Sequence, residues 1–353
     1  MTLSMDLERN KLTSLLERHR AFWMHKDMDE PLMRIYSHRQ RRRPFENVDV
    51  TPDMLDIEML TPEVGTRNMQ NQLVQGDLFR CEHAFSRIPW MEAIVGCKIH
   101  SGIGEAMWPR PALGPNYEGM ERIVPDDDNP WLMKLLDLTR ALVEANDGSY
   151  LVTHTLQRGP IDILSALLGD VRMGLAFYDE PQKIEEILKR ATQAFIKVAK
   201  AQYALIPSFE GGWVSWGYGL WAPGTVIRFQ ADSASQISPL MYQEQILPHE
   251  LDIMRAFDYS IIDLHSGGTL HLHKVLIEVE ELDAISVTID PYESSPTIED
   301  LLPVFAVILE NKSLSISGEM KMEQIDCLRQ TLPTGCLNIN ATITDKLLWE
   351  RQV

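Results

Sequence analysis

The sequence contains little cysteine for its length, with four cysteines in 353 residues. They are Cys81, Cys97, Cys327 and Cys336, and no two of them form a Cys-x-x-Cys pair. A chain of this size buries a large core and does not need disulfide staples. The sequence therefore argues against the class of disulfide-rich secreted domains, and we expect reduced thiols in a cytoplasmic protein.

Positive charge is also scarce, with Lys+Arg 33 against Asp+Glu 51 and a formal net charge of −18. Such a surface repels nucleic acid and anionic lipid, so neither is expected as a partner. One basic stretch, "HRQRRRP" at 38–44, departs from this balance. Its simplest interpretation is a solvated loop.

Long apolar runs and simple repeats are absent from the sequence. No run approaches the length of a membrane span, and the first 22 residues form an amphipathic helical pattern without the apolar core of a signal peptide. No Gly-x-Gly-x-x-Gly follows an early strand, which weakens the case for an open dinucleotide-binding sheet. We expect a cytoplasmic protein without a membrane partner.

Regular patterns begin near residue 131. Residues 1–130 are rich in Pro, Met and Trp and indicate loops between short elements, whereas 131–353 alternate between strand and helix patterns. Strand patterns cover 150–156, 259–265, 284–290, 314–319 and 336–341, and helical patterns cover 129–146, 160–170, 179–205, 297–312 and 322–332. The last four strands start roughly 22 to 30 residues apart, which indicates βα units and a parallel sheet. We predict one α/β domain over 1–353, a (β/α)8 TIM barrel with an irregular N-terminal extension.

In such a barrel the chemistry lies in loops after the carboxyl ends of the strands. The candidates are the residues that close or border each run. They are His154, Asp232, His265, Asp290, Glu319 and Cys336.

Two long segments resemble the uroporphyrinogen decarboxylase superfamily. The first is "GPIDILSALLGDVRMGLAFYDEPQKIEEILKRAT" at 159–192, with the Gly-Pro start, the Leu-Gly pair and the Asp-x-Pro helix start of that family. The second is "ADSASQISPLMYQEQILPHE" at 231–250, which is similar to its Asp-Ser followed by Ser-Pro and Leu-Pro. The resemblance covers about residue 150 to the end. It implies a (β/α)8 fold and an activity like those of the porphyrin decarboxylases, the zinc methyltransferases that work with corrinoid proteins, or cobalamin-independent methionine synthase.

The resemblance to the porphyrin decarboxylases breaks at three positions. Their Met-Arg-Gln-Ala-Gly-Arg-Tyr corresponds here to "MRIYSHRQRRR", in which Arg34 fits and Arg39 falls one residue late. Their essential Asp is missing from "CEHAFSRIPWMEAIVG" at 81–96, and no His-Gly follows Cys336. Decarboxylation of a uroporphyrinogen-like polycarboxylate is therefore only the alternative function, and it would use Arg34, Arg39, Asp232 and His265.

The resemblance to the methyltransferases implies zinc bound by a His-x-Cys and a later Cys. His265 and Cys336 match two ligands, but Gly267 stands where the middle Cys is expected. Glu319 is a substitute carboxylate, so the possible metal set is His265, Glu319 and Cys336. Against this, a buried Cys336 is more often a small apolar filler.

The loop "HSGGTLHLH" has a second interpretation that needs no metal. Gly267 and Gly268 before a helix start favour backbone N–H groups that bind a carboxylate or phosphate of the substrate, with His265 as acid or base. A tight turn without ligand is the alternative. His271 and His273 are two positions apart on a helix and so diverge.

A loop of three tryptophans precedes Asp232. Trp213, Trp216 and Trp221 either form a wall for a flat substrate or pack beneath the barrel rim. Asp232, which closes "RFQAD", is our carboxylate for general acid or base catalysis.

These features predict an enzyme acting on a small anionic substrate. The leading function is one-carbon (methyl) transfer with a corrinoid or thiol partner, and non-catalytic tetrapyrrole or corrinoid binding is third. The sequence leaves open whether the protein is a homodimer.

Overall fold

The computed structural model describes residues 2–37, 45–57, 73–85, 87–103, 106–155 and 157–343. It is an α/β structure around one large sheet in the order β3-β1-β15-β14-β13-β12-β11-β8. Seven of these strands are parallel, and β3 (Leu73–Gly76) pairs with β1 (Leu32–Ser37) in the antiparallel direction.

The parallel strands follow the chain order from β8 to β15. They are β8 (Gln157–Arg158), β11 (Val226–Gln230), β12 (Tyr259–His265), β13 (Ala284–Ile289), β14 (Ser313–Met320) and β15 (Leu337–Ile343). The last strand, β15, pairs in parallel with the first, β1. A separate parallel pair joins β4 (Cys81–Glu82) to β7 (Leu151–Val152). The parallel α/β architecture that the strand spacing predicted is thus confirmed.

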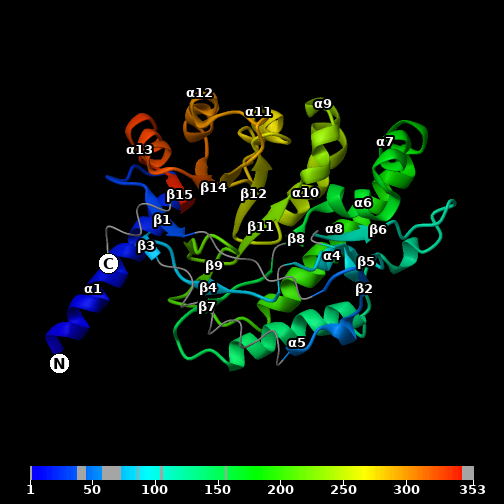
Figure 1. Ribbon diagram of the computed structural model, residues 1–353, viewed down its shortest axis with the longest axis horizontal. Helices are drawn as coiled ribbons and strands as arrows, with labels where there is room; N and C mark the ends of the chain where they lie inside the picture. The colour runs from blue at the N-terminus through cyan, green and yellow to red at the C-terminus, as the bar shows by residue number, and fades with distance from the viewer. Residues whose placement is uncertain are drawn as a thin grey trace.

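Helices connect successive strands and cover the outer side of the sheet. These are α6 (Pro160–Leu168), α7 (Asp170–Asp179), α8 (Pro181–Tyr203), α9 (Pro239–Met241), α10 (Leu247–Met254), α11 (His273–Leu276), α12 (Ile298–Leu309) and α13 (Met322–Thr331). In Figure 1, α9, α11, α12 and α13 follow one another along one side of the strands. The π-helical turn η4 (Tyr242–Ile246) joins α9 to α10.

The N-terminal part adds smaller elements. α1 (Thr2–Trp23) extends away from the body at the amino terminus, and α5 (Pro130–Glu144) lies on the side opposite to α12 (Figure 1). A three-stranded antiparallel sheet joins β2 (Val48–Val50), β5 (Lys98–Ser101) and β6 (Met107–Arg110), with α4 (Trp90–Ile94) next to it in the sequence. Short helical turns lie at η1 (Pro52–Met54), η2 (Met120–Arg122), η3 (Asp232–Gln236) and η5 (Leu270–Leu272).

Local sequence signals set several of these boundaries. The Asn129 side chain caps α5 by accepting the N–H groups of Trp131 and Leu132, and Pro130 fits the first turn. Thr297 and Asp300 form a capping box at the start of α12. Gly169, at φ 80°, separates α6 from α7 in a conformation that suits glycine.

One predicted element differs from the structure. The strand expected over 150–156 is interrupted: β7 ends at Val152 and β8 begins at Gln157. The backbone N–H of Thr155 donates to the Gln202 side chain of α8 at 3.2 Å instead of to a neighbouring strand. This diverted hydrogen bond breaks the ladder.

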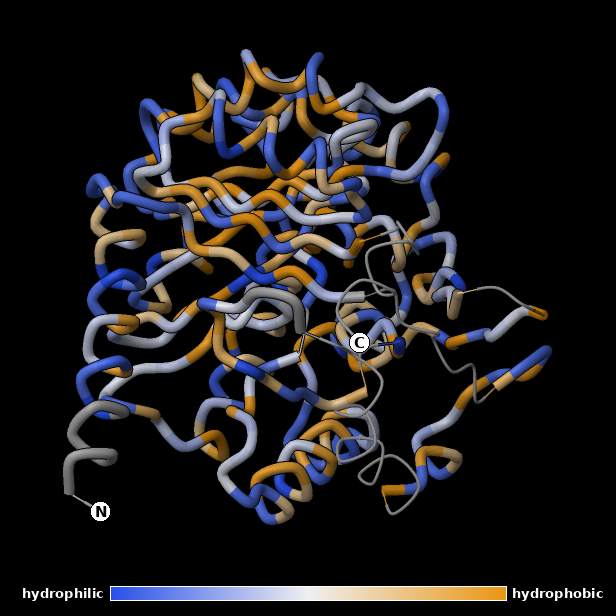
Figure 2. Tube along the Cα trace, turned by 60° about the vertical axis from the view of Figure 1, so that its left-hand side comes forward, coloured by the Kyte–Doolittle hydropathy of each residue, from blue (hydrophilic) through white to orange (hydrophobic). Residues whose placement is uncertain are grey.

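The two faces of the main sheet differ sharply in polarity. Alternate residues point to opposite faces, and the outward residues form the apolar core with the helices, among them Ile262, Leu264, Val287, Ile316 and Ile339. Figure 2 shows hydrophobic residues concentrated along the strands. The inward residues are largely polar. Paired neighbours across five strands form one row, which contains Arg34, Asn340, Ser317, Thr288 and His265.

The amino end of the inner face is closed by apolar side chains. Leu32, Val226, Ile261 and Ala284 form a buried cluster with Phe22 of α1 and with other apolar residues. The inner face is therefore apolar at one end and polar toward the carboxyl ends of the strands. No helix of the described residues is both long enough and apolar enough to cross a membrane.

Candidate active site

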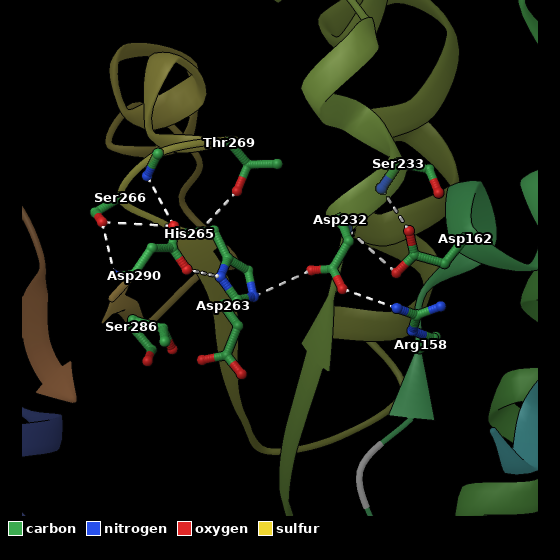
Figure 3. Close-up of polar contacts among 12 residues, drawn as sticks. Arg158, Asp162, Asp232, Ser233, Asp263, His265, Ser266, Thr269, Ser286 and Asp290 are labelled. Atoms are coloured by element: carbon green, nitrogen blue, oxygen red, sulfur yellow. Dashed lines mark hydrogen bonds and ion pairs between the residues drawn. The ribbon is translucent and has the colours of Figure 1, made fainter. Parts of the chain in front are cut away.

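The candidate site lies at the carboxyl ends of β8, β11, β12 and β13, where four charged side chains follow one another. Arg158 Nη2 donates to Asp232 Oδ2 at 3.0 Å. Asp232 Oδ1 lies 3.6 Å from His265 Nε2, and His265 Nδ1 lies 2.6 Å from Asp290 Oδ1. Figure 3 shows Asp232 between Arg158 and His265, with Asp290 on the far side of the imidazole.

Local backbone contacts hold His265 and Asp290 in place. The N–H of His265 donates to Thr269 Oγ1 at 2.9 Å, and the N–H of Asp290 donates to Ser266 Oγ at 3.0 Å. Asp290 Oδ2 accepts the N–H of Gly267 at 2.8 Å. The imidazole is thus oriented by a carboxylate that is itself fixed by the loop after β12.

The glycine loop therefore binds a carboxylate, but this carboxylate is the side chain of Asp290. The Gly267 N–H is taken by Asp290, and the Gly268 N–H donates to the carbonyl of His265 at 3.1 Å. The segment after the glycines is the short turn η5 followed by α11, not one long helix. The predicted binding of a substrate anion by Gly267 and Gly268 is corrected accordingly, because neither N–H is left to point at a ligand.

The electrostatics favour a protonated His265. Burial by itself would lower the pKa of His265, but the hydrogen bond to Asp290 and the charges of Asp232 and Asp290 outweigh it and raise that pKa above its ordinary value. Each ring nitrogen faces a carboxylate, so both nitrogens are best satisfied as donors. His265 is 32% exposed on its side chain, so the charged ring also remains accessible.

Two buried acids stand behind this row. Glu92 Oε1 pairs with Arg158 Nη1 at 3.2 Å, and burial raises the pKa of Glu92 although Arg158 opposes the shift. Asp162 of α6 accepts the N–H groups of Asp232 and Ser233. Burial, and after it the charge of Asp232, raise the pKa of Asp162 to about 7.

Arg34 is the predicted substrate-binding residue that lies on the inner face. Its Nε donates to Asn340 Oδ1 at 3.1 Å, and its Nη2 donates to the carbonyl of Gly217. Both of these acceptors are neutral oxygens. Arg39 lies outside the described residues, as does the rest of the basic stretch 38–44.

The tryptophan loop lies at the amino end of the sheet. It connects the end of α8 to the start of β11 and contains the hairpin of β9 (Trp213–Val214) and β10 (Trp221–Ala222). Trp221 is fully buried against α1, where its backbone N–H donates to His19 Nδ1 at 3.0 Å. The Trp213 indole donates to the carbonyl of Ile206 at 3.1 Å. Of the two alternatives, packing at the amino end of the sheet therefore describes Trp213 and Trp221.

Trp216 and Tyr218 of the same loop reach the polar inner face. The guanidinium of Arg228 lies 4.6 Å from the Trp216 ring and 3.8 Å from the Tyr218 ring. Tyr218 Oη contacts Asp263, Ser286 and Ser317, and Arg228 forms an ion pair with Asp263. Burial raises the pKa of Tyr218 to about 12, so the hydroxyl stays protonated and donates within this network. We call Arg228, Asp263, Tyr218 and Ser286 the floor network.

The structure does not bring together the three residues proposed for zinc. Cys336 precedes β15 at the amino end of the sheet, beside the start of β14, and its Sγ donates to the carbonyl of Lys26 at 3.3 Å. Glu319 lies near the carboxyl end of β14, paired with Thr342. Within the ranges that the structure describes, no group of three His, Cys, Asp or Glu side chains is arranged to hold a metal ion. Cys336 lies just before a strand, whereas His265 ends one. Because the strands are parallel, these two positions lie at opposite edges of the sheet.

His271 and His273 take no part in the site. His271 lies near the carbonyls of Gly268 and Ile237, and His273 Nδ1 lies 2.8 Å from the carbonyl of Leu270. All four cysteines are free. A surface hollow lined in part by Glu17, Arg18 and Arg329 lies beside α1, and none of the carboxyl-end residues lines it.

Sequence reasoning missed Arg158, Asp162, Tyr218 and Arg228 as members of polar networks. Arg158 ends a strand directly before Gly159-Pro160, which is a signal of the same kind as the one that selected Asp232. Tyr218 gave no such signal, because its partners lie up to 99 residues away in the sequence.

Comparisons with known proteins support the fold. No protein-family profile and no curated protein sequence matches the chain. Among solved structures, a methyltransferase from Methanosarcina mazei matches with a TM-score of 0.62 and 12% identity, covering 94% of each chain.

Two further matches are more distant. A B12-independent methionine synthase from a Shewanella species has a TM-score of 0.39, 11% identity and 59% coverage of each chain. A putative vitamin-B12 independent methionine synthase from Listeria monocytogenes has a TM-score of 0.36, 12% identity and covers 63% of this chain and 65% of the other. At these identities the likeness concerns the fold alone. The chain has the overall fold of the methyltransferase from Methanosarcina mazei.

Proposed function

We propose that this protein is an enzyme that transfers a methyl group, with the His265 imidazolium as the proton donor to the leaving group. The observation that carries the proposal is the placement of His265 between Asp290 and Asp232 at the carboxyl end of β12. The fold shared with a methyltransferase from Methanosarcina mazei supports the reaction class.

The two carboxylates decide the direction of proton transfer. Because the pKa of His265 is raised, its ring keeps its proton to higher pH than an ordinary histidine, which favours a role as an acid over a role as a base. Asp290 keeps the ring oriented, while Asp232 faces the nitrogen that must deliver the proton. A general acid of this kind contributes roughly 10²–10⁴-fold to a rate.

The step balances without a redox partner. A nucleophile forms a bond to the methyl carbon, the bond from that carbon to the donor's oxygen or nitrogen breaks, and the proton of His265 Nε2 goes to the departing atom. Protonation is needed because an alkoxide or amide anion is a poor leaving group. His265 regains its proton from solvent, to which it is partly exposed.

Arg34 is the proposed anchor for a small anionic substrate. It lies in the same row of inward residues as His265, and it donates hydrogen bonds to the neutral oxygens of Asn340 and Gly217. An arginine fork binds a carboxylate well in such a setting. The methyl acceptor we propose is a thiol or the cobalt of a corrinoid protein, as the family resemblance implies.

Zinc, which the resemblance also implies, does not fit the described residues. His265 Nδ1 is bonded to Asp290, Gly267 offers no side chain, and Cys336 lies at the other edge of the sheet. Three ligands are needed for a catalytic zinc.

The closed (β/α)8 barrel is part of the same proposal. The first and last strands, β1 and β15, are neighbours, and the parallel pair β4-β7 leads into β8 through the chain. If β7 and β8 count as one interrupted strand, the seven parallel strands of the main sheet and β4 give the eight strands that a closed barrel needs. Closure would place Arg34 and His265 around one central opening.

The test uses free cob(I)alamin as acceptor and a panel of small methyl donors, namely methyl ethers, methylamines and methyl-substituted carboxylates. We expect methylcobalamin to form with at least one donor, and His265→Gln to slow its formation by about 10²-fold or more. His273→Gln is the matched control, because His273 contacts a backbone carbonyl and no carboxylate in the structure. Methyl transfer that persists unchanged in His265→Gln would overturn the assignment of the acid.

Decarboxylation remains the second candidate, and Arg34 is the observation that favours it. Removal of CO2 from a polycarboxylate needs a cation near a carboxylate and an acid that protonates the resulting carbanion, and Arg34 and His265 offer both. Release of labelled CO2 from uroporphyrinogen, with no methyl transfer to cob(I)alamin, would favour this reaction over our proposal.

A further inference from the structure

Asp162 is a buried carboxylate whose hydrogen-bond donors lie outside its own helix. It lies in the first turn of α6, and its side chain points at the start of η3 (Figure 3). Oδ1 accepts the N–H of Ser233 at 2.7 Å, and Oδ2 accepts the N–H of Asp232 at 3.2 Å. Both oxygens are thus used on two consecutive backbone donors of another element.

Those two donors have no nearer acceptor. The N-cap position of η3 is Ala231, which makes no side-chain cap hydrogen bond. The first N–H groups of a helical turn need an acceptor when they are buried. Asp162 therefore caps η3 from a distance of 70 residues in the sequence.

The acids around Asp162 raise the free-energy cost of burying its carboxylate. Asp232 from η3 and Glu250 from α10 repel it, whereas Arg158 from β8, which also pairs with Glu92 of α4, attracts it. Burying an acid beside other acids costs free energy that hydrogen bonds must offset. The two backbone N–H groups are the offset that the geometry provides.

The capped turn carries the side chain that faces His265. Asp232 Oδ2 is fixed by Arg158, while Oδ1 is buried without a hydrogen-bond partner and lies 3.6 Å from His265 Nε2. A small rotation of the turn would alter this distance. The position of η3 thus decides how closely the carboxylate faces the imidazolium.

We infer that Asp162 is a positioning residue, which caps η3 and so holds the Asp232 carboxylate between Arg158 and His265. Its effect on catalysis rests on the proposed function, but its effect on His265 does not. Asp162 touches neither His265 nor the space where a substrate would meet it; it acts through Asp232.

The decisive test measures the protonation of His265 by NMR, with the imidazole signal assigned by its loss in His265→Gln. In Asp162→Asn the amide presents one acceptor and one donor to two N–H groups, so one of them loses its acceptor. Asp232 then moves away from His265, and we expect the pKa of His265 to fall toward its ordinary value. An unchanged His265 titration in folded Asp162→Asn would overturn the inference.

Asp283→Asn is the matched control. Asp283 also accepts a backbone N–H, that of Ser260 at 2.8 Å, and burial raises its pKa to about 6. It lies before β13, at the amino end of the sheet, so its replacement should leave His265 unchanged. An equal fall of the His265 pKa in both variants would indicate general loosening and contradict a specific role.

A double variant tests the route of the effect. Asp232→Asn should lower the pKa of His265 by itself, and Asp162→Asn added to it should lower it no further, because the carboxylate that Asp162 positions is gone. Additive effects would contradict action through Asp232.

One measurement needs no variant and so does not depend on whether Asp162→Asn folds. In the wild-type protein the amides of Asp232 and Ser233 should exchange slowly with solvent, since both donate to a buried carboxylate. Rapid exchange of both amides would overturn the inference.

Activity gives the final, separable result. If methyl transfer is observed, we expect Asp162→Asn to lower kcat about ten-fold with KM little changed. If no methyl transfer is found but the His265 titration responds as described, the proposed function fails and the positioning role stands.

Discussion

Two charge networks lie at different levels of the same inner face, and they differ in access to solvent. In the floor network the side chains of Arg228 and Asp263 are 6% and 1% exposed. In the row at the carboxyl end, Arg158 and Asp232 are 30% and 29% exposed. The same kinds of groups thus meet once as a closed contact and once as an accessible one.

This difference in exposure indicates a structural role for the floor network and a chemical role for the row at the carboxyl end. Tyr218 hydrogen-bonds to both Arg228 and Asp263, and the side chains of these two residues are almost fully shielded from solvent, so the floor network is not accessible to a ligand. At the carboxyl end Asp232 Oδ1 lacks a hydrogen-bond partner, and the pKa of the neighbouring His265 is raised. An accessible proton donor next to an unsatisfied acceptor is a reactive arrangement.

The largest stability effect should come from the floor network. Arg228→Leu leaves Asp263 charged, buried and without its cation, which should cost about 3–5 kcal/mol of the free energy of unfolding. Arg158→Leu should cost less, because its ion pair with Asp232 is partly exposed and the raised pKa of the buried Glu92 lets that acid take up a proton when its cation is removed. Chemical denaturation of both variants measures the contrast.

The double variant Arg228→Leu/Asp263→Leu sharpens the same comparison. Removing both charges spares the chain an unpaired buried carboxylate, so this protein should be more stable than Arg228→Leu alone. Equal losses of unfolding free energy in Arg228→Leu and Arg158→Leu would contradict the expectation that the buried floor network contributes more to stability than the exposed row.

A smaller but more specific effect is expected at Asp290. Asp290→Asn removes the charge that raises the pKa of His265, so the ring should lose its proton at a lower pH. An activity that needs the protonated ring is full below that pKa and falls as pH rises through it. The falling limb of the pH profile should therefore move to lower pH, with about 10- to 100-fold loss of activity at neutral pH.

The pH profile distinguishes this effect from a general loss of stability. Asp258→Asn is the control, because Asp258 accepts the N–H and hydroxyl of Thr225 at the amino end of the sheet. It should leave the profile in place. The same sign applies to folding: the stability that His265 gains from Asp290 is present below its ordinary pKa and is lost as pH rises through the raised value.

The sequence predicted the positions along the chain better than the contacts between them. The strand expected over 259–265 is β12 with the same bounds, and His265 and Asp232 lie at the carboxyl edge as the parallel pattern implied. Strand periodicity and βα spacing carry that information locally.

The contacts were harder because they join distant segments. Arg158 meets Asp232 across 74 residues, and Asp162 meets Ser233 across 71. Nothing in the spacing of these residues indicates which of several acids will face which strand end. The occupant of the Gly267 N–H was missed for the same reason, since Asp290 is on the next strand's loop.

The smallest effect is expected at Cys336, and it tests the separation of the two edges of the sheet. Cys336 has a φ of 65° and its Sγ contacts the carbonyl of Lys26, so Cys336→Ala removes one weak hydrogen bond and leaves the backbone conformation unrelieved. We expect a loss of about 1 kcal/mol in the free energy of unfolding and no change in the pKa of His265. Metal content, measured in protein purified without chelator, should be the same in Cys336→Ala as in the wild type. If a metal were lost both in Cys336→Ala and in His265→Ala, the two side chains would have to share one ion. That result would contradict the described strands, which place the two residues at opposite edges of the sheet.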